Sequence, residues 1–276
     1  MHPYRSKSLI TGFALLCMIF LFAIFGPMFS SHTYYETALE NKNLPPSSKH
    51  WFGTDDLGRD IFVRTCYGAR ISLGVGICAA IIDVIIGVLW GSVAAYSGGW
   101  TDEIMMRIAD LLQSLPNLLI ILLVMVVLGS GLVPIIIALT IMGWITMARI
   151  VRAQILKLKE REFVQAAVSL GANKYRILFS DLLPNAVSPI IVTMTLTVPT
   201  AIFTEAFMSF LGLGVQAPIA SWGTMTNEGL PALQYYPWRL FFPSLFISVT
   251  MFSFNLIGDS LRNSLDPNTN IKLRLP

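Results

Sequence analysis

The sequence predicts an all-α integral membrane protein that crosses the bilayer six times. Of its 276 residues, 54% are hydrophobic and only 13% are charged, which is too apolar for a water-soluble chain of this length to bury in its core. The hydrophobic residues form long uncharged runs, and the cationic residues gather in a few loops between them. We therefore expect a single transmembrane domain that occupies the whole chain, 1–276.

Composition also argues against several other classes of protein. The net charge of +3 is too small and too dispersed for a nucleic-acid-binding protein. No glycine-rich phosphate-binding loop ending in Lys-Ser/Thr is present, so we expect a non-catalytic subunit. The cysteines and histidines lack the spacing of a metal site, a disulfide framework or a catalytic group, so no metal or cofactor is expected in this chain. These residues are Cys17, Cys66, Cys78, His2, His32 and His50.

The first expected span is 9–30, an uncharged run that follows Arg5 and Lys7. Such a run can cross a hydrocarbon layer about 30 Å thick at roughly 1.5 Å per residue. A cleaved signal peptide is the alternative, but the run exceeds the usual apolar region of about 7–15 residues and lacks a small-x-small cleavage pattern. We expect a retained span and a cytoplasmic N-terminus.

The segment 31–70 is polar, carries charges of both signs and is expected outside the cytoplasm, where longer loops tolerate such charge. Its aspartate-rich part, 53–60, has two interpretations. A calcium loop would need alternating Asp or Asn ligands and a terminal Glu, which are missing. A structural turn that leads into a helix is therefore favoured.

The next spans are expected at 71–97, 111–128 and 132–148, with a short charged connection at 101–110 and a kink at Pro116. Asp83 is the one formal charge in the first of these runs. An ionisable residue at that depth is costly, so Asp83 is either a functional residue or a carboxyl that is protonated or hydrogen-bonded between helices.

Two glycines in the same run, Gly87 and Gly91, have the small-xxx-small spacing. This spacing predicts that a neighbouring helix packs closely against them.

The loop 149–185 carries the strongest concentration of positive charge in the chain and is therefore expected in the cytoplasm. Lys159 is interpreted as a solvated anchor of this topology. Apolar residues at helical spacing over 162–170 predict an amphipathic helix. Gly171 is its expected stop, because glycine readily ends a helix.

A second helix is expected after this stop, with Asn173 as its N-cap, an end near Leu183 and Pro184 as the closing residue. The pair is either a projecting hairpin or a helix that lies flat on the lipid. The small residues Ala166 and Ala167 favour the hairpin, because they let another protein backbone come close.

The last two spans are expected at 186–211 and 240–258. The first contains two prolines and Glu205, so we expect it to be bent and to face protein or water at that carboxyl. Six spans with both termini in the cytoplasm satisfy the charge of every loop.

A family resemblance rests on several motifs. Ala166-Ala167, then Gly171, then Leu183-Pro184 resembles the EAA loop of ABC-importer permeases, although Gln165 replaces the leading Glu and Asp181 replaces an aliphatic residue. Further motifs resemble the second permease subunit of dipeptide, oligopeptide and nickel ABC importers. They are HWFGTDDLGRD (50–60), YGARISL (67–73), SFLGLG (209–214), WG (222–223) and NLIGDSLR (255–262).

This resemblance implies a six-helix type I ABC-importer permease fold with a cytoplasmic EAA coupling hairpin, in a multi-pass protein of the cell (inner or plasma) membrane. The expected partners are a homologous second permease, two cytoplasmic ATPases that bind ATP and Mg²⁺, an external solute-binding protein and membrane lipid. The residues expected to couple to the ATPases are Gln165, Ala166, Ala167, Gly171, Leu183 and Pro184.

The expected solute is a di- or oligopeptide, and the alternative within the same family is nickel or another small solute. A rival of a different class is an ion-coupled secondary transporter or channel that uses Asp83 and Glu205. The sequence leaves the solute open.

Overall fold

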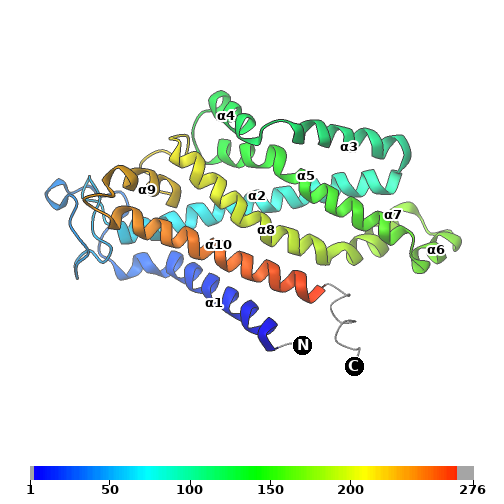
Figure 1. The fold of residues 1–276 in the computed structure, drawn as a ribbon, viewed down its shortest axis with the longest axis horizontal. Coiled ribbons are helices and arrows are strands. Elements are labelled where there is room, and N and C mark those ends of the chain that lie inside the picture. Colours follow the sequence, from blue (N-terminus) through cyan, green and yellow to red (C-terminus); the bar gives the residue numbers. More distant parts are fainter. Residues whose placement is uncertain (1–2, 266–276) are drawn as a thin grey trace.

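The computed structural model describes residues 3–265, which form a bundle of helices without a strand in that range. Long helices run side by side along the longest dimension of the molecule, and loops and short helices lie at its two ends (Figure 1). The α-helices are α1 (Pro3–Phe25), α2 (Ile61–Ser97), α3 (Gly99–Ser114), α4 (Asn117–Leu128), α5 (Leu132–Lys159), α6 (Glu162–Ser169), α7 (Lys174–Arg176), α8 (Leu183–Phe210), α9 (Trp222–Gly229) and α10 (Trp238–Leu265). Short 3₁₀ turns occur at Gly26–Phe29, Leu39–Asn41 and Leu230–Ala232, and a π-helical segment, η3, spans Ile177–Leu182.

Five helical stretches are long and apolar enough to cross a membrane, and α3 with α4 makes up to a sixth if this bent pair counts as one span. The predicted fold class, an all-α integral membrane protein of this type, is confirmed. The count of six holds when the bent pair is one broken crossing.

The bent pair corrects one prediction. The segment 101–110, expected to be a short charged connection, is part of helix α3, and α4 leaves it at an angle of 84°. The break falls at Leu115, which is extended with φ −77° and ψ 139°. The following residue, Pro116, disfavours helical backbone in the residue before it. The chain therefore breaks into two helices at this point, where only a kink within one helix was predicted.

Several helices extend beyond the predicted spans. Helix α2 begins at Ile61 rather than at residue 71, because the side chain of Asp60 caps it by accepting the backbone N–H of Val63. Helix α5 continues to Lys159 rather than ending near 148. The length of an apolar run predicts how much of a helix can lie in lipid. The helix itself can continue into polar sequence, as long as no residue interrupts its backbone hydrogen bonds.

Helix α2 lies at the centre of the bundle, where it packs against α5 and α8. The predicted close approach at its glycines is confirmed: a Cβ on Gly91 would lie 2.3 Å from the carbonyl oxygen of Ala148, and one on Gly87 would lie 2.6 Å from Cβ of Met147. The backbones of α2 and α5 therefore approach to a distance that only glycine permits.

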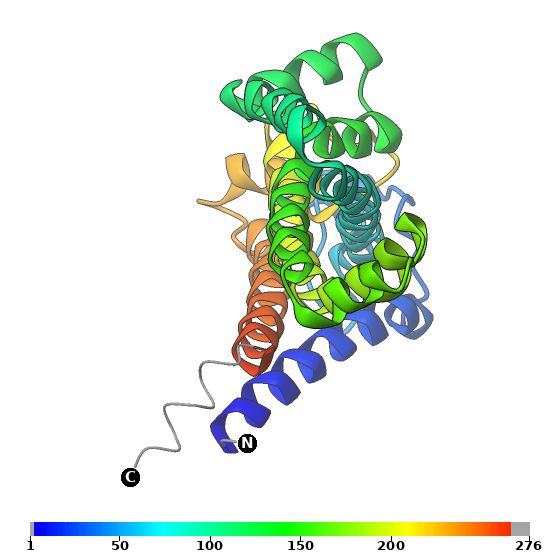
Figure 2. The same ribbon diagram turned by 90° about the vertical axis from the view of Figure 1, so that its right-hand side faces the viewer.

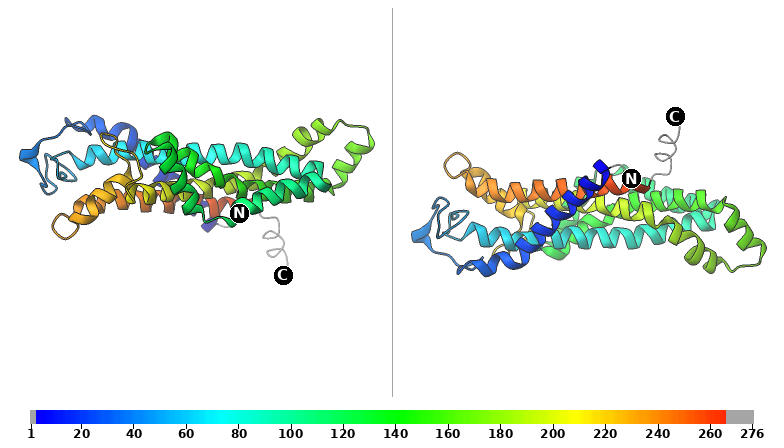
Figure 3. Two further views of the ribbon diagram at one scale, coloured as in Figure 1. Left: turned by 90° about the horizontal axis from the view of Figure 1, so that it is seen from above. Right: turned by 90° about the horizontal axis from the view of Figure 1, so that it is seen from below.

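The two ends of the bundle differ. Helices α6 and α7 project from one end, and the loop between α1 and α2 lies with α9 at the other, as the views from above and below also show (Figure 3). Helix α1 begins and α10 ends side by side, and both of these ends point toward the end that carries α6 (Figures 1 and 2). The first and last described residues therefore lie on the α6 side of the bundle.

Candidate functional site

The predicted turn between helices α6 and α7 is present in the structure. Helix α6 ends in a Schellman motif, in which the N–H of Ala172 donates to the carbonyl of Ala167 at 3.0 Å and that of Gly171 to Val168 at 2.9 Å. Gly171 has a φ of +77°, a left-handed conformation that glycine adopts without steric cost. The predicted roles of Gly171 as the stop and of 162–170 as a helix are confirmed in the structure.

The second helix departs from its prediction. Asn173 caps it as expected, because its side chain accepts the N–H of Tyr175 at 3.2 Å. Pro184 does not close it: the helix passes through the π-helical segment η3 into α8, with the proline in the first turn of α8. The wide π turn tolerates a residue without an N–H, and the side-chain amide of Asn185 donates to the carbonyl of Asp181 at 2.6 Å.

The coupling hairpin, by which we mean residues 162–182, is anchored to the long helices. Val164 of α6 is buried in one cluster with residues of η3 and of the last turns of α5. The cluster also contains Val151, Ile155, Ile177, Leu178 and Leu182. These side chains pack the hairpin against α5, and η3 joins it to α8.

Large apolar side chains are exposed on the coupling hairpin, among polar ones such as Gln165, Lys174 and Arg176. Leu170 is 88% exposed and Tyr175 is 73% exposed, close to the Gly171 turn. Three more exposed apolar side chains surround them: Phe163, Val168 and Phe179. Large apolar residues exposed together on one projection indicate a contact surface for another protein.

The predicted coupling residues occupy different parts of this region. Gln165 and Ala166 are exposed, Ala167 is half-buried, and Gly171 lies at the tip. Leu183 and Pro184 lie apart from the tip, at the start of α8. Leu170 and Tyr175, which are exposed beside the glycine stop, were not among the predicted coupling residues.

Lys159, interpreted as a solvated anchor, has a different environment. Its Nζ donates to the carbonyls of Ala95 at 3.0 Å and of Tyr96 at 3.3 Å, and it lies 5.6 Å from the centroid of the Tyr96 ring. The prediction was wrong because Lys159 ends α5 beside the last turn of α2. A cation at a helix C-terminus satisfies unpaired carbonyls and is attracted by the helix dipole.

A cavity of about 590 Å³, partly open to the surface of the chain, is bounded by α2, α3, α4, α5 and α8. Asp83 lies in its wall, together with hydroxyl side chains of α8. The carboxyl of Asp83 is only 3% exposed. Asp83 is therefore a buried carboxyl beside a cavity whose lining mixes apolar side chains with hydroxyls and amides.

Glu205, the second predicted intramembrane carboxyl, is fully enclosed by protein. Its Oε2 accepts from Ser72 Oγ at 3.1 Å and its Oε1 accepts from Ser209 Oγ at 2.9 Å. Ser72 in turn accepts the backbone N–H of Trp222 at 3.2 Å. The prediction that Glu205 faces protein or water rather than lipid is confirmed, and its partners connect α2, α8 and α9.

The structure does not bring Asp83 and Glu205 together. Glu205 bonds Ser72 of α2, whereas Asp83 lies further along the same helix. Along the axis of α2, Ser72 and Asp83 are about 16 Å apart at roughly 1.5 Å rise per residue. A shared two-carboxylate ion site is therefore not formed.

The loop before α2 is held by ion pairs at the opposite end from the hairpin. Asp55 accepts from Nε of Arg59 at 2.7 Å and from Arg64, and both arginines also pair with Glu228 at 3.1 and 3.0 Å. Burial alone would raise the pKa of Asp55, but Arg64, Arg59 and the backbone N–H groups of Arg59 and Leu57 outweigh burial and hold that pKa below its ordinary value. The favoured interpretation of 53–60, a structural turn that leads into a helix, is confirmed.

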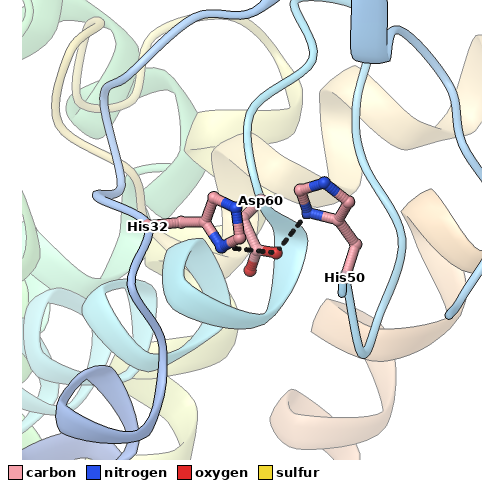
Figure 4. Close-up of side chains that lie close together, drawn as sticks. All are labelled: His32, His50 and Asp60. Atoms are coloured by element: carbon pink, nitrogen blue, oxygen red, sulfur yellow. Dashed lines mark hydrogen bonds and ion pairs between the residues drawn. The ribbon is translucent and has the colours of Figure 1, made fainter. Parts of the chain in front are cut away.

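Two histidines that looked scattered in the sequence converge on Asp60 (Figure 4). His50 Nδ1 lies 2.8 Å and His32 Nδ1 lies 3.9 Å from Asp60 Oδ2. Within residues 3–265 this is the one group of ligand atoms close enough together to hold a metal ion, all within 4.8 Å of one another. The other oxygen of Asp60 caps α2 through Val63, so the arrangement already acts as a hydrogen-bonded clamp between the loop and this helix.

Comparisons with known proteins give consistent results. Residues 87–271 match the family described as binding-protein-dependent transport system inner membrane component, and residues 4–46 match the N-terminal TM domain of oligopeptide transport permease C. The chain is 62% identical over 268 residues to the oligopeptide transport system permease protein OppC of Bacillus subtilis (strain 168), covering 97% of this chain and 88% of that protein.

A second relative and a solved structure extend this result. The chain is 55% identical over 264 residues to the dipeptide transport system permease protein DppC of the same organism, covering 95% of this chain and 82% of that protein. Inward facing conformations of the MetNI methionine ABC transporter contain a chain with a TM-score of 0.59 at 17% identity, over 72% of this chain and 94% of that chain. That likeness concerns the fold alone.

Proposed function

The chain belongs to the family of binding-protein-dependent transport system inner membrane components, and from that premise we propose that it serves as one permease subunit of an ATP-driven importer of di- or oligopeptides. The names of its relatives, which are oligopeptide and dipeptide permeases, support this solute class over nickel. A membrane cavity bounded by several helices supports a role in passage of the solute.

The observation that carries the proposal is the coupling hairpin. Its exposed apolar tip, with Leu170 and Tyr175, suits a groove on another protein, and its buried side joins it to α5 and α8. Both of these helices border the cavity. A partner that grips the tip can therefore move the two cavity walls as a rigid unit.

The proposed partners follow from this arrangement. Two cytoplasmic ATPases bind ATP and Mg²⁺ and grip the hairpin through Gln165, Ala166, Ala167 and Gly171, while Leu183 and Pro184 fix its base. A homologous permease completes the path from the other side. An external solute-binding protein docks at the opposite end of the bundle, where α9 and the loop before α2 lie.

The proposed topology places both termini and the hairpin in the cytoplasm and the segment 31–70 outside, in the cell membrane. The concentration of Lys and Arg in the loop 149–185 supports this topology. The first and last described residues also lie toward the hairpin end of the bundle. The rival class is an ion-coupled transporter or channel that works alone and uses Asp83 and Glu205 as ion or proton sites. The names of the relatives support the importer over this rival, and Glu205 is hydrogen-bonded between α2 and α8 rather than free for an ion.

The test is uptake by the reconstituted importer. This chain, the partner permease and the ATPases are co-expressed, purified as a complex, inserted in liposomes and supplied with the binding protein and a labelled tripeptide. We expect uptake that requires Mg-ATP and the binding protein, and none when the ATPases are omitted. Uptake by the chain alone, driven by an ion gradient, would favour the secondary transporter instead.

A further inference from the structure

Within residues 3–265, the cavity bordered by Asp83 is lined by one acidic side chain and by no basic one. Its volume of about 590 Å³ is in the range of small-molecule sites. Among the described residues that line it, Asp83 is the one formally charged side chain, and none is Lys, Arg or His. The charge of the lining is therefore negative whenever Asp83 is ionised.

Asp83 itself lacks a partner. The side chain is 3% exposed, and its Oδ1 has no hydrogen-bond partner among the described residues. Its other oxygen lies over Gly143, where an added Cβ would come within 2.2 Å of Oδ2. The absence of a side chain at Gly143 therefore leaves the space that the carboxyl occupies between α2 and α5. A buried carboxylate without a partner is costly, so a ligand that donates hydrogen bonds to it would be stabilised here.

Four threonines on one face of α8 border the same cavity: Thr193, Thr197, Thr200 and Thr204. Each hydroxyl donates its proton to a carbonyl of its own helix: Pro189 for Thr193, Thr193 for Thr197, Leu196 and Thr197 for Thr200, and Thr200 for Thr204, at 2.8–3.0 Å. A hydroxyl has one donor and two acceptor lone pairs. The threonines can therefore offer the cavity acceptors only.

The amides of Gln113 and Asn117, from α3 and α4, and the hydroxyl of Thr146, from α5, complete the polar part of the wall. An amide presents a carbonyl oxygen as readily as its N–H₂ group. The cavity thus combines one carboxylate with a row of hydroxyl acceptors and no competing cation. The ligand that matches this pattern is a group with several donors and a positive charge.

We infer that Asp83 and the α8 threonines form a site for an ammonium group on the passing solute, such as the free N-terminus of a peptide. This inference rests on the proposed function for the identity of the solute. Asp83 supplies the counter-charge, and the threonine oxygens accept N–H protons as the group moves along α8. The site is transient, since a path must release what it binds.

The first experiment tests the site without transport. Thr200→Cys is placed in a background in which Cys17, Cys66 and Cys78 are replaced, and the assembled importer reacts with methanethiosulfonate reagents that carry either an ammonium or a sulfonate. We expect the ratio of the two modification rates to favour the ammonium reagent, and Asp83→Asn to lower this ratio about fivefold. Glu205→Gln is the matched control, because this carboxyl is equally buried but fully bonded, and it should leave the ratio unchanged.

The second experiment identifies the ligand. Trialanine and N-acetyl-trialanine, both at millimolar concentration, compete with the reagents for the cavity. We expect trialanine to slow the modification of Thr200→Cys, the acetylated peptide to have a weaker effect, and this difference to vanish in Asp83→Asn.

Two results would overturn the inference. A modification ratio that is the same with aspartate and asparagine at position 83 would show that the carboxyl sets no charge preference in the cavity. Equal protection by both peptides, or protection only by Na⁺ or K⁺, would show that the site does not bind a peptide ammonium. The proposed function is judged separately, by ATP-dependent uptake of the peptide.

Discussion

The hydroxyl of Ser72 donates to the carboxyl of Glu205 at 3.1 Å, so a residue of α2 is hydrogen-bonded directly to a buried residue of α8, next to α9. The same hydroxyl accepts the backbone N–H of Trp222, whose indole N–H donates to the carbonyl of Thr65 at 3.0 Å. Helices α2, α8 and α9 are thus joined at one point. Glu205 therefore has a structural role, unlike the unpartnered Asp83.

Replacing Glu205 tests this distinction. Glu205→Ala leaves the hydroxyls of Ser72 and Ser209 without their acceptor, and a buried unsatisfied group costs about 1–3 kcal/mol. Glu205→Gln keeps one acceptor oxygen and should cost less. The measurement is the thermal unfolding midpoint of the purified complex in detergent, and equal midpoints for the wild type and Glu205→Ala would contradict the structural role.

Asp55 should make the end of the bundle that carries α9 and the loop before α2 sensitive to acid. Its pKa is held below the ordinary value of 3.8 in the folded state. A depressed carboxyl pKa stabilises the fold at pH values above the unfolded value, and this stability is lost as the pH falls through the folded value. Below about pH 4, the wild type should therefore lose thermal stability more steeply than Asp55→Asn, whose stability is lower at neutral pH. Parallel pH profiles for the two proteins would contradict this assignment.

Lys159→Met should loosen the C-terminal turn of α2 without altering the membrane spans. The lysine donates to the carbonyls of Ala95 and Tyr96, and such a contact contributes about 0.3–1 kcal/mol. Hydrogen exchange should accelerate at the backbone N–H of Gly98, which bonds the carbonyl of Ala94 in the same turn. Lys159→Arg, which retains the charge, is the control, and unchanged exchange in Lys159→Met would indicate a solvated lysine after all.

Leu170 offers a test of docking that is separate from folding. Its side chain is 88% exposed, so Leu170→Ala should change the unfolding midpoint very little, since little packing is lost. If the ATPase buries this side chain, the affinity between the permease pair and the ATPases should fall by about 1.5–3 kcal/mol, the value for burying a leucine. Surface plasmon resonance with immobilised ATPase measures this, and Lys157→Ala, at an exposed position of α5 outside the hairpin, serves as a surface control. Equal affinity for Leu170→Ala and the wild type would place the contact elsewhere.

The sequence predicted features that depend on local chemistry and missed those that depend on distant contacts. The stop at Gly171, the cap at Asn173 and the close approach at Gly91 follow from backbone sterics and capping, which are properties of a few neighbouring residues. The bonds from Lys159 to α2 and from His50 to Asp60 depend on which segments meet in three dimensions. The length of α3 was missed because its charged residues, including Asp102, resemble a loop, whereas Arg152 of α5 pairs with Asp102 at 2.6 Å and stabilises the helix there.

The cavity was also beyond prediction from sequence. Asp83 was visible as a charge in an apolar run, but the threonines of α8 that share its cavity lie more than a hundred residues away in the chain. Their spacing of three and four residues places them on one face of a helix. Without knowledge of which helix that face meets, hydroxyls that bond their own backbone are indistinguishable from ordinary membrane threonines.

Gly171 provides the most direct test of the central claim, that the coupling hairpin transmits ATP hydrolysis to the permease. No atom lies within 4 Å of an added Cβ at this glycine, so a side chain there points into the space that the ATPase would occupy. Gly171→Asn is the matched control, since asparagine tolerates a left-handed backbone better than other side chains. Arginine adds both bulk and a local strain of about 1 kcal/mol.

The measurement is ATP hydrolysis by the reconstituted complex, with and without the peptide-loaded binding protein. We expect Gly171→Arg to insert and bind the external protein normally but to lose ATPase docking and stimulated hydrolysis, while Gly171→Asn retains most of both. Normal docking and full stimulation in Gly171→Arg would contradict the account, because the hairpin would then have no part in coupling.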